Sequence, residues 1–137
     1  MTESNEINFL YAGISLRVKA AMLDGFILIL SMMGVSFLFA EFESVPDQTR
    51  MIAFVLLFVF YDPLFTSFSG GTIGHKMMGL RVQQKEKPLK NINFLKAIIR
   101  FFLKAILGWI SLLTVDSKKE NQALHDMAVG SVVVCMK

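Results

Sequence analysis

Two long apolar segments, separated by a short polar turn, dominate the pattern of hydrophobic and polar positions. Residues 20–40 form a run of 21 positions in which Asp24 is the only charge, and residues 51–69 form a run of 19 in which Asp62 is the only charge. At about 1.5 Å per helical residue, each run approaches the ~30 Å core of a bilayer. Residues 41–50 carry three acids, one base and Pro46, which is typical of a turn. We therefore predict a transmembrane hairpin, with a first helix over 16–40, an outer turn over 41–50 and a second helix over 51–69.

Asp24 is an unusual residue for such a segment. A carboxylate at the centre of a bilayer costs about 2.5 to 3.5 kcal/mol on insertion scales, so we expect it to have a partner or a function. Arg17 precedes it by seven positions, and seven steps of about 100° return to nearly the same helix face. Arg17, Ala20 and Asp24 are therefore predicted to share one stripe of the first helix.

The distribution of charge predicts the orientation of the hairpin. Residues 70–104 hold eight Lys or Arg and one acid, and Arg17 and Lys19 flank the first helix. The positive-inside bias places these residues and the N-terminus in the cytoplasm. Asp24 and Asp62, which lies about 10 Å from the end of its helix, would then meet at one depth. Together they could bind a cation or a proton; alternatively, each pairs with a base such as Arg17 and only fastens the helices together.

A glycine-rich loop begins the segment over 70–90. Its sequence superficially suggests a phosphate-binding loop, but the Gly-Lys-Ser/Thr ending is absent because His75 separates Gly74 from Lys76, which argues against nucleotide binding. Thr72 is predicted to cap a short interfacial helix that ends at Gly79. Residues 80–84 then alternate apolar and polar side chains and the turn over 85–88 follows, so a small cytoplasmic β-hairpin is expected.

A basic amphipathic segment covers residues 91–115. Lys96, Arg100 and Lys104 recur every four residues among Phe, Ile and Leu, which predicts a helix lying in the headgroup plane with anionic lipid on its basic stripe. The alternative is a third membrane span whose stripe faces Asp24 and Asp62. We favour the in-plane helix, because a third span would move two further lysines to the outer side.

The C-terminal segment over 116–137 contains two candidate charged residues, Asp116 and Asp126. Asp126 follows His125, and a run of valines after them predicts a short extended segment. Adjacent residues of a helix do not face each other, so His125 and Asp126 are not by themselves a metal or catalytic pair. Asp126 is instead expected to bind a nearby base, either Arg17 or one of the basic stripe.

Composition agrees with a membrane protein. The 137 residues are 54% hydrophobic and 18% charged, with net charge +3, and one small domain leaves no room for a separate soluble catalytic domain. Residues 1–15 lack a basic start and are expected to stay as an N-terminal tail. With two histidines and one cysteine, Cys135, a zinc site and an internal disulfide are not expected. The predicted class is an all-α membrane protein, not an enzyme, without cofactor or nucleic-acid partner.

Three blocks of sequence follow one another along the chain. They are Tyr11-Ala-Gly before Arg17-x-x-Ala20-x-x-x-Asp24, then Gly71-Thr72-Ile-Gly74-x-Lys76-x-x-Gly79-Leu-Arg-Val, and Gln122-Ala-Leu-His-Asp126-x-x-x-Gly130-Ser-Val-Val-Val. Together they resemble the RDD family of small membrane proteins, which is named for one arginine and two aspartates. The resemblance implies that Arg17 and Asp24 are the arginine and first aspartate, and that Asp126 or Asp116 is the second. Ser131 stands where Thr is usual, and His75 where a basic or small residue is more frequent. The family is widespread in bacteria and transport is suspected, which implies the inner membrane.

Three functions remain open. The first is transport of an ion or small solute, for example cation/proton exchange, with Asp24 and Asp62 binding the cation or proton while Arg17 and the basic stripe adjust their protonation. Because two spans cannot enclose a pathway, this function requires a homo-oligomer or a partner membrane subunit. The second is an accessory or assembly role. The third, an intramembrane aspartyl protease suggested by Tyr61-Asp62, is disfavoured because Gly-x-Gly-Asp is missing and Asp24-Gly25 is a poor substitute.

Overall fold

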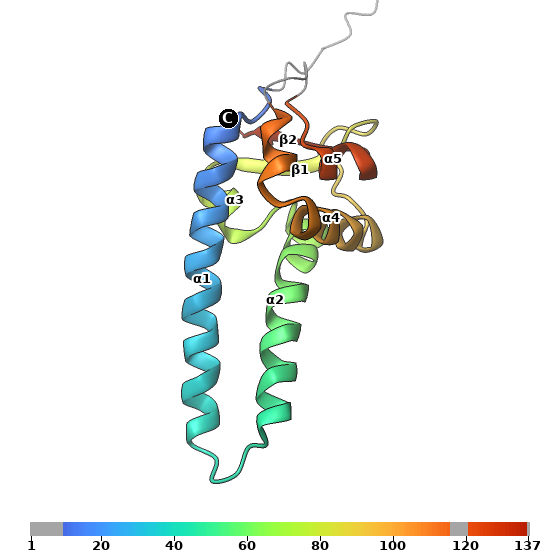
Figure 1. Ribbon diagram of the computed structural model, residues 1–137. Coiled ribbons are helices and arrows are strands. Elements are labelled where there is room, and N and C mark those ends of the chain that lie inside the picture. The colour runs from blue at the N-terminus through green and yellow to red at the C-terminus, as the bar shows by residue number, and fades with distance from the viewer. Residues whose placement is uncertain (1–9, 116–120, 137) are drawn as a thin grey trace, which may run out of the picture.

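The computed structural model describes residues 10–115 and 121–136, and its elements form a long hairpin with a small head at one end (Figure 1). The two arms of the hairpin are α1 and α2, joined by a turn at the far end. We call the remaining elements, with the segments between them, the head. The elements are α1 (Ile14–Ala40), α2 (Asp47–Ser69), α3 (Ile73–Met77), β1 (Leu80–Gln84), α4 (Phe94–Leu113), α5 (Leu124–Val129) and β2 (Ser131–Cys135).

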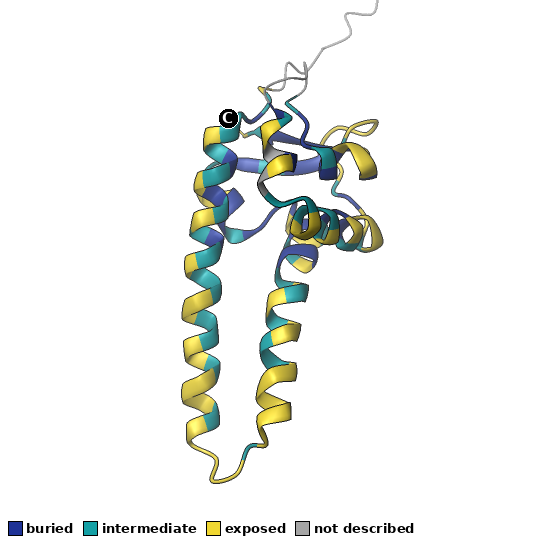
Figure 2. Ribbon diagram, in the orientation of Figure 1, coloured by how far each residue is buried: buried dark blue, intermediate teal, exposed yellow. Residues whose placement is uncertain are grey.

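The arms expose their apolar side chains. In the most apolar 18-residue stretch of each arm, only 6% of the residues of α1 and 17% of those of α2 are buried. A helix in the core of a soluble protein would be mostly buried. Phe26, Phe37 and Ile52 are at least 60% exposed. Figure 2 shows the same division, with buried residues concentrated in the head and the adjoining helix ends, and exposed residues along the arms. Both arms are long and apolar enough to span a membrane.

The predicted short helix after the second arm is present as α3. The Thr72 side chain accepts a hydrogen bond from the backbone N–H of His75 at 3.3 Å, so Thr72 is the N-cap. Gly70 and Gly79 lie on either side of this turn with φ of 76° and 67°. Such left-handed values favour glycine, and they let the chain leave α2 and enter β1 over a short distance.

The predicted local β-hairpin is wrong, although both extended segments exist. β1 pairs antiparallel with β2, with Val82 opposite Val133, so the partner strand comes from the far end of the chain. The alternation of apolar and polar side chains identifies a strand, but it does not identify the strand with which it pairs. The valines of β2 are buried, and β1 pairs with this strand along its edge. The chain after Pro88 continues into α4 instead of forming a neighbouring strand. The fold is therefore mostly helical with one two-stranded sheet, not all-α.

α4 lies across the end of α2 rather than alongside the arms (Figure 1). Aromatic contacts hold the two helices together: the rings of Phe58 and Phe101 meet edge to face at 5.9 Å, and those of Phe60 and Phe94 stack at 6.3 Å. At Gly108 the backbone leaves helical geometry, with φ 51° and ψ −132°, and the helix kinks. α4 therefore does not run alongside the two arms, and its placement in the headgroup plane stays a prediction.

A small core in the head anchors the first arm to the sheet. Ala12, just before α1, and Ala20, near its start, pack with the strand residues Leu80, Val82 and Val133. The backbone N–H of Ala12 also donates to the carbonyl of Val133 at 2.9 Å. The end of α1 that carries Arg17 is thereby fixed against the C-terminal strand.

Candidate functional site

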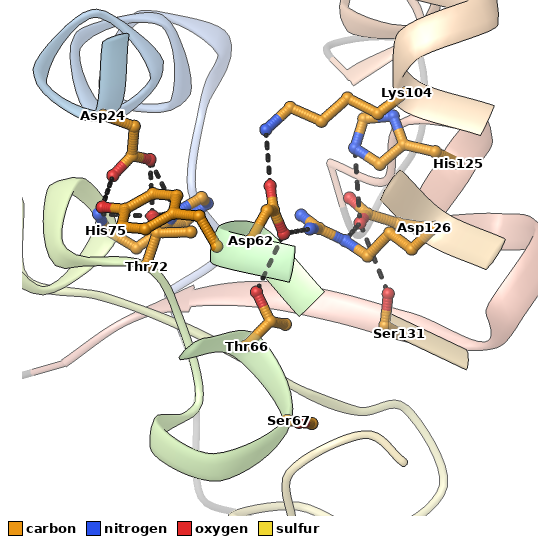
Figure 3. A network of polar contacts seen from close by, with 12 residues as sticks. Asp24, Asp62, Thr66, Ser67, Thr72, His75, Lys104, His125, Asp126 and Ser131 are labelled. Carbon is orange, nitrogen blue, oxygen red and sulfur yellow. Dashed lines mark hydrogen bonds and ion pairs between the residues drawn. The ribbon is translucent and has the colours of Figure 1, made fainter. Parts of the chain in front are cut away.

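Three buried carboxylates from three helices lie at the junction of the arms and the head. Asp24 comes from α1, Asp62 from α2 and Asp126 from α5, and their exposed fractions are 7%, 7% and 0%. Figure 3 shows them in one region of the molecule, with Asp24 and its partners in one group and Asp62 and Asp126 in another. A buried carboxylate is costly unless it is paired or hydrogen-bonded, so the partners of each one indicate what it can do.

Asp126 is held by two arginines. Arg17 Nη1 donates to Oδ2 at 2.5 Å and Arg100 Nε donates to Oδ1 at 2.8 Å, while the Ser131 hydroxyl donates to Oδ1 at 3.3 Å. Burial alone would raise the pKa of Asp126, but the two guanidinium groups hold it well below its usual range. The expectation that Asp126 binds Arg17 or the basic stripe is confirmed, and both supply partners. This cluster ties α1, α4 and α5 together.

Arg17 and Asp24 share the predicted stripe but do not pair. Arg17, Ala20 and Asp24 are the buried residues of α1. The other nitrogens of the Arg17 guanidinium donate to the backbone carbonyls of Ala12 at 3.2 Å and Asn121 at 2.7 Å. Arg17 is thus occupied by the head.

His125 lies closer to Asp126 than adjacent positions on a helix suggest. Its Nε2 is 3.6 Å from Asp126 Oδ1, and its Nδ1 is 2.6 Å from the Ser111 hydroxyl. Burial and, to a smaller extent, the surrounding cations lower the pKa of His125 to about 3 despite the nearby Asp126 carboxylate. The imidazole is therefore neutral near pH 7 and acts as a packed structural group.

Asp62 is paired with α4. Lys104 Nζ donates to Oδ2 at 3.2 Å, the Thr66 hydroxyl donates to Oδ1 at 3.1 Å, and Arg100 Nη1 lies 3.6 Å from Oδ1. That Nη1 is buried without a hydrogen-bond partner among the described residues. Arg100 therefore stands between Asp62 and Asp126 and links the second arm to α5.

The predicted basic stripe is divided between two environments. Arg100 is 1% exposed and Lys104 points inward to Asp62, whereas Lys96 is exposed. A continuous stripe along the headgroup plane is therefore wrong. The alternative that the stripe faces the two aspartates is confirmed for Asp62, which Arg100 and Lys104 contact, but among the described residues neither base forms an ion pair with Asp24.

Asp24 has a different set of partners. Its Oδ1 accepts from the Tyr61 hydroxyl and from the backbone N–H of Gly74, both at 2.8 Å, and its Oδ2 accepts from the Thr72 hydroxyl at 2.5 Å. His75 Nδ1 lies 3.7 Å from Oδ2. No Lys or Arg of the described segments forms an ion pair with Asp24, so neutral donors surround this carboxylate.

Gly74 allows the loop to reach Asp24. A Cβ at this position would collide with the backbone carbonyl of Ala20 and would lie 2.7 Å from Asp24 Oδ1. The glycine therefore permits the N–H to approach the carboxylate. Of the other loop residues singled out in the sequence, Thr72 belongs to the site, Gly71 and Gly79 shape the loop, and Lys76 is exposed.

Asp24 and Asp62 line one cavity of about 290 Å³ between α1, α2 and α4. They share it as their predicted common depth suggests, but each binds its own partners. The volume suits an ion with its water or a very small solute. The lining residues are Ala21, Asp24, Gly25, Leu28, Phe58, Tyr61, Asp62, Phe101, Lys104 and Ala105.

Sequence reasoning did not assign His75 and Thr66 to the site and considered Tyr61 only as part of a protease motif. Tyr61 and His75 belong to it because α2 and α3 pack against the same part of α1, a tertiary relation that local patterns do not carry. Asp116 lies outside the described residues. In the part of the chain that is described, no group of three or more His, Cys, Asp or Glu could hold a metal ion.

The chain matches a protein-family model. The family model described as the RDD family matches residues 11–130, which is most of the chain and includes all three buried carboxylates. No curated protein and no solved structure matches the chain.

Proposed function

The chain belongs to the RDD family, and on this premise we propose that it transports an ion or small solute across a membrane, specifically as a cation/proton exchanger. The two apolar arms and the family support a membrane protein. In the proposed arrangement the arms cross a bacterial inner membrane. The N-terminus and the head, which carries most of the basic residues, lie in the cytoplasm.

One observation carries the proposal: the buried Asp24 carboxylate lines the cavity without a Lys or Arg partner among the described residues. Neutral hydrogen bonds stabilise a carboxylate, but in a low-dielectric environment its charge still attracts a cation or a proton. Asp62 and Asp126, in contrast, are already paired with bases. Asp24 is therefore the group best suited to bind the cation and the proton alternately.

Asp62 provides a second, competing site. A cation in the cavity would meet Asp62 Oδ2, which Lys104 Nζ contacts at 3.2 Å. The Lys104 side chain is 28% exposed, so it is free to withdraw, and Arg100 Nη1 remains close to Asp62 when it does. We infer that Lys104 occupies the place of the cation when the site is empty. Arg17, held by the head, has a structural role instead of adjusting the acids in the cavity.

The described residues of a single copy provide two candidate spans, and these cannot enclose a pathway. The exposed apolar faces of the arms, including Phe26, Leu30 and Ile52, are open to lipid, to further copies of the chain or to a partner membrane subunit. We therefore include a homo-oligomer, or a complex with a partner subunit, in the proposal. Anionic lipid would contact the exposed lysines of the head, such as Lys96, but not the buried Arg100.

The test is a flux measurement with the purified protein in proteoliposomes. We expect cation-dependent proton flux that Asp24→Asn abolishes, because the amide keeps the size of the side chain but cannot carry the negative charge. Asp47→Asn, at an exposed position near the far turn, is the matched control and should transport normally. Retained flux in an Asp24→Asn protein that still assembles would overturn the proposal.

An accessory or assembly role is the second candidate. The observation that favours it is that Asp62 and Asp126 both have ion-pair partners and join α1, α2, α4 and α5. A wild-type protein that moves no ion in proteoliposomes, but whose deletion dissolves a membrane complex, would establish this role in place of transport.

A further inference from the structure

The hydrogen bonds of Asp24 continue away from the cavity. Thr72 Oγ1 lies 2.5 Å from Asp24 Oδ2 and 2.6 Å from His75 Nδ1, so a single hydroxyl bridges the carboxylate and the imidazole (Figure 3). Of these three residues only Asp24 lines the cavity. Thr72 and His75 are 0% and 3% exposed. The chain thus runs from the cavity into the interior of the head.

The Thr72 hydroxyl can be fully hydrogen-bonded in two protonation states. With Asp24 ionised, the hydroxyl donates to Oδ2 and accepts from the backbone N–H and the protonated Nδ1 of His75. With Asp24 protonated, it accepts from the carboxyl and the same N–H, and it donates to a bare Nδ1. A hydroxyl has one donor and two acceptor positions, and both arrangements use all three. Neither state leaves a donor or acceptor position of the buried Thr72 hydroxyl unsatisfied.

We propose that Thr72 relays a proton between Asp24 and His75, which makes His75 the second proton-binding group of the exchanger. The inference rests on the proposed exchange function and deepens it. In the transfer, Asp24 gives its proton to Thr72 Oγ1 while Thr72 gives its own proton to His75 Nδ1. One O–H bond breaks and one forms at Thr72, Asp24 becomes a carboxylate, and His75 becomes an imidazolium that can release a proton from Nε2.

The surroundings of His75 favour passing the proton on over storing it. The charged and titratable groups that face it are Asp24 from α1, Asp62 from α2, and Arg100 and Lys104 from α4. Burial lowers the pKa of His75, its contact with Asp24 opposes this effect, and the two cations of α4 lower the pKa further. A cation bound at Asp24 would stabilise the carboxylate and so drive the proton toward His75. That coupling is what exchange requires.

The experiment compares substitutions along the relay in proteoliposomes with an imposed cation gradient. Thr72→Val removes the bridging hydroxyl and Thr72→Ser keeps it. His75→Gln keeps a hydrogen-bonding side chain that cannot titrate, and it leaves the cap on α3 intact. Ser31→Ala is the matched control, because it removes a hydroxyl of α1 that donates to the backbone carbonyl of Ile27, outside the cavity and the relay.

We expect Thr72→Val and His75→Gln to lower proton flux by roughly tenfold or more, whereas Thr72→Ser and Ser31→Ala stay within a few-fold of the wild type. The rate should also decline in acid as His75 becomes protonated, and His75→Gln should lose this decline. The relay is wrong if Thr72→Val and His75→Gln both assemble and exchange at the wild-type rate and with the wild-type pH profile. It is also wrong if Thr72→Ser loses as much proton flux as Thr72→Val. The outcomes remain distinguishable, because failure of the function itself appears as wild-type protein without flux or as active Asp24→Asn.

Discussion

Arg17 and Asp24 occupy one buried stripe of α1, yet they have separate partners. The guanidinium of Arg17 reaches Asp126, 109 residues further along the chain, whereas Asp24 accepts hydrogen bonds from the loop that follows α2. One helix face thus carries two separate polar contacts, about two turns apart. The turn with Arg17 fastens the head to the arm, and the turn with Asp24 faces the cavity.

The first prediction concerns the cluster of Arg17, Arg100 and Asp126 that fastens the head to the first arm. Arg17→Ala leaves the Asp126 carboxylate with one arginine in a fully buried position, so we expect it to destabilise the protein by about 3 to 5 kcal/mol. Thermal unfolding in detergent, followed by loss of the monodisperse species, measures the effect. Lys19→Ala is the control, since Lys19 is exposed on the same turn and should change little. Equal stability of the two variants would contradict the role given to Arg17.

The second prediction concerns acid. The folded-state pKa of His125 is about 3, below the ordinary 6.5, so below pH 6.5 the unfolded chain takes up a proton that the folded protein does not. Stability should therefore fall as the pH is lowered from 6.5 toward 3, by up to about 1.4 kcal/mol per pH unit from this group. Denaturation profiles of the wild type and of His125→Asn should diverge in slope over this window. Parallel profiles would show that His125 titrates normally.

The sequence predicts the arms well and the head less completely. Apolar runs, the seven-residue spacing of Arg17 and Asp24, and the cap at Thr72 are local properties, and each has its counterpart in the structure. The partner of β1, the inward turn of Arg100 and the contacts of His75 depend on segments far apart in sequence. Local periodicity identifies the face of an element, but it does not identify what that face meets.

The third prediction concerns the close approach of the loop to α1. Gly74→Ala places a Cβ 2.7 Å from Asp24 Oδ1 and against backbone, so α3 must move away and the hydrogen bond from Gly74 is lost. We expect a loss of about 1 to 3 kcal/mol and a strong loss of flux. Gly34→Ala is a matched control on α1, where a Cβ meets nothing within 4 Å. Normal flux in Gly74→Ala would show that the loop need not touch Asp24.

The last prediction separates fastening from transport at Asp62. If Lys104 stands in for the cation, Lys104→Met leaves Asp62 more open to a cation, with Arg100 Nη1 still 3.6 Å away. Exchange should then begin at lower cation concentration, because the ion no longer displaces an ammonium group. If Lys104 only fastens α4 to α2, Lys104→Met should lose stability without a change in cation dependence. Adding Asp62→Asn to Lys104→Met should then recover part of that stability, which a double-mutant cycle measures. Measuring the half-saturating cation concentration and the unfolding temperature of both single variants and the double variant decides between the two roles, because a fastening residue changes only the second quantity.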